Sequence, residues 1–258
     1  MNFGIGKCYN CLANKEKINH SLWREVSMAE RALTTLFLLM SVDGKISTGS
    51  TDNMDVDKDF PSIAGVKEGL SQYYEIEQTT DLWSLNSGRV QKKMGVNEKE
   101  LPTKTSVSFV LIDNQHLTEH GVRYFCALSK HFVLITSNKE HPAFSIDEDN
   151  LHIIFQERFE PRKMLCVLKE EYGCEKITVQ SGGTLNCVLL RDGLIDYVDI
   201  IVAPVLIGGN KTSTLIDGYS FTDANELNKL GILELHSVEQ LKNSYLRLKY
   251  KVIHSVKG

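Results

Sequence analysis

The segment 177–209 constrains the fold more than any other part of the chain. Its residues 177–179 form a short strand-like apolar run, and the apolar residues that follow recur at helical spacing until Gly193. Gly182 and Gly183 therefore lie where a strand ends and a helix begins. This order of elements is typical of α/β folds, in which helices flank a mostly parallel sheet.

The same alternation of strand-like and helical patterns extends over most of the chain. The polar segment 48–60 lacks periodicity and is expected to be a surface loop. The last two apolar runs, joined by a short polar connection, indicate an antiparallel hairpin at the sheet edge. The expected fold is α/β, with a mostly parallel central sheet flanked by helices and a C-terminal antiparallel hairpin. Strands are expected at residues 33–40, 81–86, 106–113, 131–137, 151–156, 197–209, 232–239 and 245–253, and helices at residues 65–78, 88–94, 117–129 and 160–173.

Composition excludes several classes of protein. A chain of 258 residues that is 42% hydrophobic can bury one large core, so one main domain is expected. Its 29 basic and 33 acidic residues nearly balance and form no basic stripe, so nucleic acid is not an expected partner. The longest apolar run of the first half, residues 36–40, is too short to cross a bilayer. These features predict a soluble, cytoplasmic protein without a membrane partner.

The first 27 residues show neither helical nor strand periodicity, so a flexible extension is expected at 1–27 and the folded domain at 28–258. Cys8 and Cys11 in this extension form a C-x-x-C pair, whereas the other four cysteines are scattered among apolar residues. A structural zinc site needs a second pair at comparable spacing, and the chain has none. No metal site is expected.

The glycine pair permits two interpretations. Without a Cβ atom, Gly182 and Gly183 would let a ligand phosphate approach the main chain, where the free N–H groups of the first helical turn offer donors and a favourable dipole. Alternatively, the two glycines only form a tight turn. The first interpretation predicts that Gly183→Val abolishes cofactor binding at little cost in stability.

Four stretches together carry a resemblance to a known family. "SVDGKIS", "NSGRV", "SGGTLN" and "LLRDGLIDYVDIIVAPVLIGG", in that order, resemble the reductase domain of the riboflavin-biosynthesis pyrimidine reductases, which have a dihydrofolate-reductase-like fold. The similarity covers about residues 33–251 and is most specific over 177–209. It implies a dihydrofolate-reductase-like fold, NADPH as hydride donor, a phosphorylated pyrimidine or related small molecule as substrate, and a homodimer.

The resemblance also implies where the cofactor binds. Lys92 and Lys93 would add positive charge near one of these contacts, although each can equally belong to a solvated helix face. Hydroxyl groups and cations near the cofactor would suit the 2′-phosphate of NADPH. The implied contacts come from three loops and comprise Gly88, Arg89, Thr136, Ser137, Asn138, Gly182, Gly183, Thr184 and Leu185.

Asp43 is the implied catalytic residue. In the family the matching aspartate faces the substrate beside the nicotinamide, where a carboxyl group or an ordered water could protonate the heteroatom next to the reduced carbon. Alternatively, Asp43 only caps the amide of Lys45 in a turn. Lys45 and Ser181 are further implied substrate contacts. Ser181 departs from the family pattern, because many members have a glutamate there, and the preceding Gln180 cannot act as an anionic anchor either.

The resemblance implies an NADPH-dependent oxidoreductase similar to 5-amino-6-(5-phosphoribosylamino)uracil reductase, which converts a ribosyl group to ribityl in riboflavin biosynthesis. Two alternatives stay open: a reductase of another pterin-like or small carbonyl substrate, and a nucleotide-binding protein without turnover. The zinc signature of the family's deaminase half, H-x-E followed by P-C-x-x-C, is absent from the sequence, so a stand-alone reductase is expected.

Overall fold

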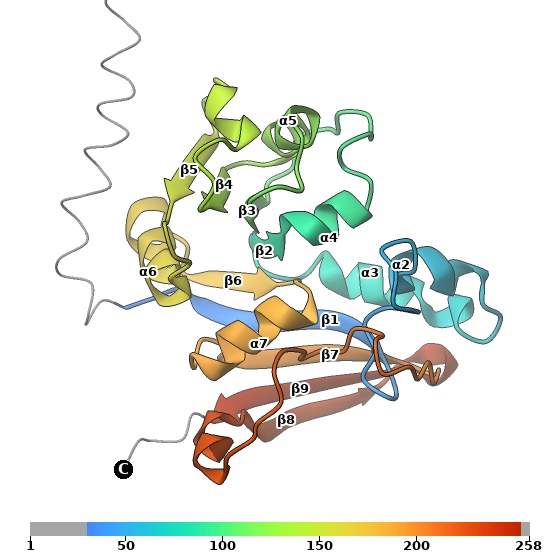
Figure 1. The fold of residues 1–258 in the computed structure, drawn as a ribbon. Helices are drawn as coiled ribbons and strands as arrows, with labels where there is room; N and C mark the ends of the chain where they lie inside the picture. The colour runs from blue at the N-terminus through green and yellow to red at the C-terminus, as the bar shows by residue number, and fades with distance from the viewer. Residues whose placement is uncertain (1–29, 254–258) are drawn as a thin grey trace, which may run out of the picture.

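The computed structural model describes residues 30–253, which form one nine-stranded sheet in the order β5-β4-β3-β2-β6-β1-β7-β9-β8 (Figure 1). Strands β1 to β7 run parallel to one another, and β9 pairs antiparallel with both β7 and β8. The predicted α/β class, with its terminal hairpin, is confirmed. The extension 1–27, with Cys8 and Cys11, lies outside the described residues.

The observed strands begin and end within a few residues of the predicted ones, except that the strand predicted at 197–209 ends at Ala203. Alternate side chains of the central strand enter different cores, Leu36 on one face and Phe37 with Leu39 on the other, so this strand is buried on both sides. The strands are β1 (Leu33–Ser41), β2 (Trp83–Ser87), β3 (Ser108–Ile112), β4 (Phe132–Thr136), β5 (Leu151–Phe155), β6 (Lys176–Val179), β7 (Tyr197–Ala203), β8 (Ile232–Gln240) and β9 (Leu246–Ile253).

The helices differ from the prediction in two places. The segment 48–60, predicted as a loop, ends in a short helix because the Asp55 side chain accepts a hydrogen bond from the Asp57 amide and caps it. The helix predicted at 65–78 is a 3₁₀ turn, Lys67–Gly69, followed by a shorter α-helix. The α-helices are α2 (Val56–Asp59), α3 (Ser71–Glu77), α4 (Gly88–Lys93), α5 (Glu119–Leu128), α6 (Pro161–Tyr172) and α7 (Gly183–Arg191).

Two helices and one irregular segment position the site. Apolar residues of α6 and α7 pack on the face of β1 and β6 that includes Leu36. On the opposite face, the segment that contains α2 and α3 packs against β1 and β7 around Phe60, Tyr73 and Tyr245. The hydroxyl of the buried Tyr245 donates to the Val66 carbonyl at 2.7 Å, which ties this segment to the hairpin. Segments 56–77 and 182–191 are thereby held at fixed places around β1.

The strand order places the carboxyl ends of three central parallel strands side by side. Strand β6 lies between β2 and β1, although it follows both in sequence, and the chain then crosses β1 through α7 to β7. Ligands of open α/β sheets bind outside the carboxyl ends of strands at such a reversal. The residues that follow β1, β2 and β6 are therefore the first place to look for a site.

Candidate functional site

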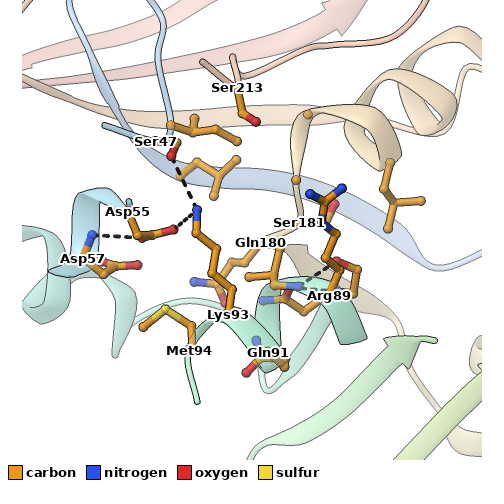
Figure 2. A pocket seen from close by; sticks show the side chains of 18 of the residues that line it. Ser47, Asp55, Asp57, Arg89, Gln91, Lys93, Met94, Gln180, Ser181 and Ser213 are labelled. Atoms are coloured by element: carbon orange, nitrogen blue, oxygen red, sulfur yellow. Dashed lines mark hydrogen bonds and ion pairs between the residues drawn. The ribbon is translucent and has the colours of Figure 1, made fainter. Parts of the chain in front are cut away.

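A cavity of about 840 Å³ lies at the carboxyl ends of β1, β2 and β6. Its walls come from these strands, from the segment with α2 and α3, and from α4 and α7 (Figure 2). The volume is in the range of small-molecule and cofactor sites. Of the implied contacts, Arg89, Ser181 and the four residues 182–185 line it.

The two glycines have different environments. Neither has a positive φ, so backbone freedom is not the reason for them. A Cβ atom on Gly183 would overlap the Thr214 carbonyl oxygen and the Asp217 carboxylate, whereas on Gly182 its nearest neighbour would be Val90 Cγ2 at 3.8 Å. Gly183 therefore accommodates another part of the chain, and Gly182 has space beside it. The expectation that Gly183→Val costs little stability is wrong, because the branched side chain would have to displace these groups.

The N-terminus of α7 is directed to the cavity wall. Gly182 is its N-cap and provides no side-chain hydrogen bond, and residues 182–185 line the cavity. The N–H groups of a first helical turn have no intrahelical acceptor, and the helix dipole places partial positive charge there. This end of the helix can therefore receive an anionic group of a ligand.

Ser181 and Gln180 link α7 to its surroundings. The Ser181 hydroxyl donates to Asn186 Oδ1 at 2.6 Å, and Asn186 Nδ2 donates to the Leu215 carbonyl at 2.9 Å. Gln180 Oε1 accepts from the Ser84 hydroxyl at 3.0 Å, and its Nε2 donates to a carboxylate oxygen of Glu77. Both side chains before the glycine pair are thus engaged with protein groups.

Helix α4 supplies two cations of the cavity, and Lys99 also lines it beyond the end of this helix. Arg89 lines it and pairs with Asp52 at 3.0 Å, but its side chain is 68% exposed, and such pairs are weak enough to exchange partners. Lys93 pairs with Asp55 at 2.8 Å and lies near the Ser47 hydroxyl, as Figure 2 shows. Its side chain is only 14% exposed, so the interpretation of Lys93 as part of a solvated helix face is wrong, whereas Lys92 is exposed as that interpretation requires.

Two carboxyl groups on the α2–α3 side of the cavity escaped sequence reasoning. Tyr74 donates its hydroxyl proton to Asp57 Oδ1 at 3.0 Å, and burial, with the nearby Asp55, raises the pKa of Asp57. Burial also raises the pKa of Glu77. The aspartate-rich composition of 48–60 was the one available signal for Asp57, and nothing in the sequence singled out Glu77.

Asp43 does not line this cavity. Its carboxylate accepts hydrogen bonds from Ser41 Oγ at 2.5 Å and from the amides of Ile207 at 3.0 Å and Gly208 at 2.6 Å. These bonds, that of Ser41 first, lower the pKa of Asp43 to about 2. The alternative cap is wrong in its partner, because the amide of Lys45 donates to Ser41 Oγ.

The remaining implied contacts also lie outside the cavity lining. Lys45 Nζ donates to the carbonyls of Gly209 and Thr212 at 2.8 and 3.1 Å. Gly88 is buried, and a Cβ atom there would overlap the Asp113 carboxylate. The loop after β4 is bound to Asn114, since Thr136 Oγ1, the Ser137 amide and Asn138 Nδ2 all donate to this residue's oxygens, at 3.1, 2.7 and 2.8 Å.

Comparison with known proteins identifies the family. The family model described as the RibD C-terminal domain matches residues 32–246, which is most of the chain. The chain belongs to the RibD C-terminal domain family. The resemblance drawn from the four sequence stretches is thereby confirmed.

Two curated relatives of this family match a shorter stretch. A 2,5-diamino-6-ribosylamino-4(3H)-pyrimidinone 5′-phosphate reductase of Methanothermobacter thermautotrophicus is 31% identical over 87 residues, 33% of this chain and 36% of the relative. A reductase of the same name from Archaeoglobus fulgidus is 33% identical over 75 residues, 29% of this chain and 34% of the relative. The match thus spans about a third of the length of these relatives.

Solved structures of the RibD family share the fold. RibD of Acinetobacter baumannii superimposes with a TM-score of 0.62 at 15% identity, over 86% of this chain and 58% of that one. Riboflavin biosynthesis reductase Rib7 of Saccharomyces cerevisiae gives 0.54 at 12% identity, over 86% and 90%. Within residues 30–253, no helix is long and apolar enough to span a bilayer, and no cluster of three or more His, Cys, Asp or Glu side chains is placed to hold a metal ion.

Proposed function

We propose that this chain is an NADPH-dependent reductase of a ribosylaminopyrimidine 5′-phosphate and converts the ribosyl group to ribityl. The observation that carries the proposal is the N-terminus of α7, which reaches the wall of the cavity at the carboxyl ends of β1, β2 and β6 in a RibD C-terminal domain. The printed names of the two archaeal relatives supply the substrate class.

The residues present fit NADPH. Gly182 leaves open space beside the first-turn N–H groups of α7, so a pyrophosphate can approach these donors. The exposed guanidinium of Arg89 offers a charge-assisted hydrogen bond to a further phosphate. When bound, NADPH supplies the hydride. The loop with Thr136, Ser137 and Asn138 remains a proposed cofactor contact outside the cavity, because it follows the carboxyl end of β4, which is parallel to the strands of the cavity.

The proposed part of Asp43 differs from proton donation. A carboxylate with a pKa of about 2 is ionised at neutral pH, and its bonds to the Ile207 and Gly208 amides hold segment 205–209. We therefore assign Asp43 as a positioning residue. Lys45 orients the same segment through the Gly209 carbonyl, and Ser181 orients α7 through Asn186.

Turnover tests the function. Incubation with NADPH and the 2,5-diamino-6-ribosylamino-4(3H)-pyrimidinone 5′-phosphate, or its uracil counterpart, should consume NADPH and form the ribityl product, followed by absorbance and mass spectrometry. Binding of NADPH without oxidation by either compound would favour the alternative of a nucleotide-binding protein. Oxidation only with pterin-like or small carbonyl compounds would assign a different reductase.

Cofactor selectivity tests the proposed part of Arg89. A charge-assisted hydrogen bond to phosphate contributes about 1.5–3 kcal/mol, so Arg89→Gln should weaken NADPH binding roughly tenfold or more while NADH binding changes little. Arg123→Gln is the matched control, because Arg123 also forms an exposed ion pair but lies outside the cavity lining. Fluorescence titration gives both dissociation constants. Equal losses for the two cofactors would contradict the assignment.

We also propose that the protein is a homodimer that pairs through β8. Register places Leu233, Leu235 and Val238 on the face of the hairpin that carries Tyr250 and Leu248, because a bulge after Leu235 keeps the alternation in phase. Tyr250 and Leu248 pack against the core, whereas Leu235 and Val238 are 54% and 58% exposed. An apolar face at an open sheet edge is typical of an interface. Cytoplasmic location and the absence of nucleic acid as a partner remain predictions.

A further inference from the structure

The cavity has an uneven charge distribution. Arg89 and Lys93 lie on α4 and pair with Asp52 and Asp55. On the α3 side, the carboxyl of Glu77 receives its hydrogen bond from the neutral amide of Gln180. In the described part of the chain, Glu77 has no lysine, arginine or histidine nitrogen within 4.0 Å.

Glu77 differs in this respect from the other carboxyl group on its side, that of Asp57. Lys93 lies near enough to Asp57 to lower its pKa in part, whereas the groups that act on the Glu77 pKa, besides burial, are Gln180 and the like-charged Asp57. Glu77 is thus a partly buried acceptor whose charge no neighbouring cation offsets. A ligand that offers hydrogen-bond donors would stabilise it.

The position of the Glu77 carboxyl is fixed by β6. Gln180 accepts from Ser84 through Oε1 and donates to Glu77 through Nε2, so the orientation of its amide is determined by the network. Gln180 lies two residues before Gly182, and both residues line the cavity. A pyrimidine ring bound beside Glu77 would therefore lie next to the NADPH pyrophosphate site proposed at α7, with its hydrogen-bond donors directed to the carboxylate.

At the edge formed by C2 and N3, a pyrimidine presents two adjacent donors in only one of its two relevant forms. In a 2-amino-4(3H)-pyrimidinone, the substrate class in the names of the archaeal relatives, the 2-amino group and N3–H are adjacent donors. A carboxylate accepts both in a bidentate arrangement. In the uracil form a carbonyl oxygen replaces the amino group, and two acceptors would face each other.

We propose that Glu77, oriented by Gln180, binds the 2-amino and N3–H edge of the pyrimidine and selects the 2-amino-4-pyrimidinone over the 2-oxo form. The inference rests on the proposed reductase function. It assigns to Glu77 a role in substrate specificity. Ser181 and Asp43 do not have this role, since their side chains are hydrogen-bonded to other protein groups.

The test compares two substrates in three proteins. Wild type should prefer the 2-amino compound over the uracil compound at least tenfold in kcat/KM. Glu77→Gln should lower this ratio at least tenfold, mainly through KM, because its amide can donate to the 2-oxo group. Glu75→Gln, an exposed position on the same helix that does not line the cavity, should leave the ratio unchanged.

Binding measurements keep the test independent of turnover. Calorimetric dissociation constants of the two ribityl products should show the same ratios, so a chain that binds but does not reduce would disprove the function and still decide the inference. Gln180→Met should leave the fold intact and lower the preference for the 2-amino compound by less than Glu77→Gln does, since it removes the group that orients Glu77 but keeps the carboxylate. A wild-type protein without preference, or a Glu77→Gln variant that keeps the wild-type ratio, would overturn the proposal.

Discussion

At the scale of single residues, the lack of a Cβ atom matters for a different physical reason at Gly182 than at Gly183. Gly183 is close to Thr214 and Asp217, and its missing Cβ atom makes room for the chain. Gly182 has no neighbour nearer than Val90 and lines the cavity. Gly183 therefore serves close packing, which neither interpretation of the sequence predicts, and the approach of a phosphate stays a proposal for Gly182.

Alanine substitutions separate these reasons. Gly182→Ala should keep the free energy of unfolding within about 1 kcal/mol of wild type, because the added methyl meets only ordinary contacts, but should weaken NADPH binding at least tenfold by filling space beside the α7 amides. Gly183→Ala should cost about 1–3 kcal/mol through overpacking. Denaturant unfolding and cofactor titration on one preparation measure both quantities. Wild-type affinity in Gly182→Ala would remove the phosphate site from α7.

At the scale of elements, the fully buried Asp113 carboxylate joins the end of β3 to α5 and to the 3₁₀ turn Pro142–Ser145. It accepts from the Leu117 amide at 2.8 Å and from His141 Nε2 at 3.1 Å. His141 Nδ1 accepts from the Ala143 amide, so the ring proton is on Nε2. Burial alone would raise the pKa of Asp113, but hydrogen bonds from His141, Leu117 and His116 hold it well below its usual range.

Asp113→Asn should destabilise the fold. An amide cannot accept from all these donors, and each one left unsatisfied costs about 1–3 kcal/mol. Since the folded pKa is depressed, the stabilising effect is present above the unfolded pKa of about 4 and is lost as pH falls below it. Urea unfolding should show a lower midpoint for the variant at neutral pH and a flatter decline below pH of about 4. The exposed Asp147→Asn is the control, and equal midpoints for the two variants would contradict this assignment.

At the scale of the whole molecule, the sheet has two unlike halves. The parallel strands are covered by helices and the α2–α3 segment, whereas β8 is exposed along its whole length (Figure 1). The apolar side chains of β8 lie on the same face of the sheet as Leu248 and Tyr250 of β9. The core packs against these two residues of β9 but does not extend over β8. A second copy related by a two-fold axis would extend this face on both partners at once.

Substitutions on the two faces of β8 test the dimer. Leu235→Glu places a charge in the proposed interface and should shift the protein toward monomer, with at least a tenfold rise in the dimer dissociation constant. Ser237→Glu on the opposite face is the control. Light scattering coupled to gel filtration measures the mass over a range of concentrations. A wild-type protein that stays monomeric, or equal effects of the two variants, would disprove this interface.

The sequence by itself determined the order of elements, the bounds of most strands within a few residues, the hairpin and the place of the glycine pair, because hydrophobic period and capping are properties of neighbouring residues. Helix α4 is an example, since the side chain of Ser87 accepts from the Val90 amide and caps it directly before the predicted helix. The segment 48–60 is a partial exception, because Asp55 caps a short helix where a loop is predicted.

The tertiary structure alone decided which side chains meet. Asp43 accepts from the Ile207 amide 164 residues away, Gln180 donates to Glu77 across 103 residues, and Lys93 pairs with Asp55. The physical reason is that strand order is a long-range property. Strand β6 lies between β1 and β2 although it follows both in the sequence, and the hydrophobic period of neighbouring residues does not predict this position. The glycine pair could therefore be identified from the sequence, whereas Glu77, which lines the same cavity, could be identified only from the tertiary structure.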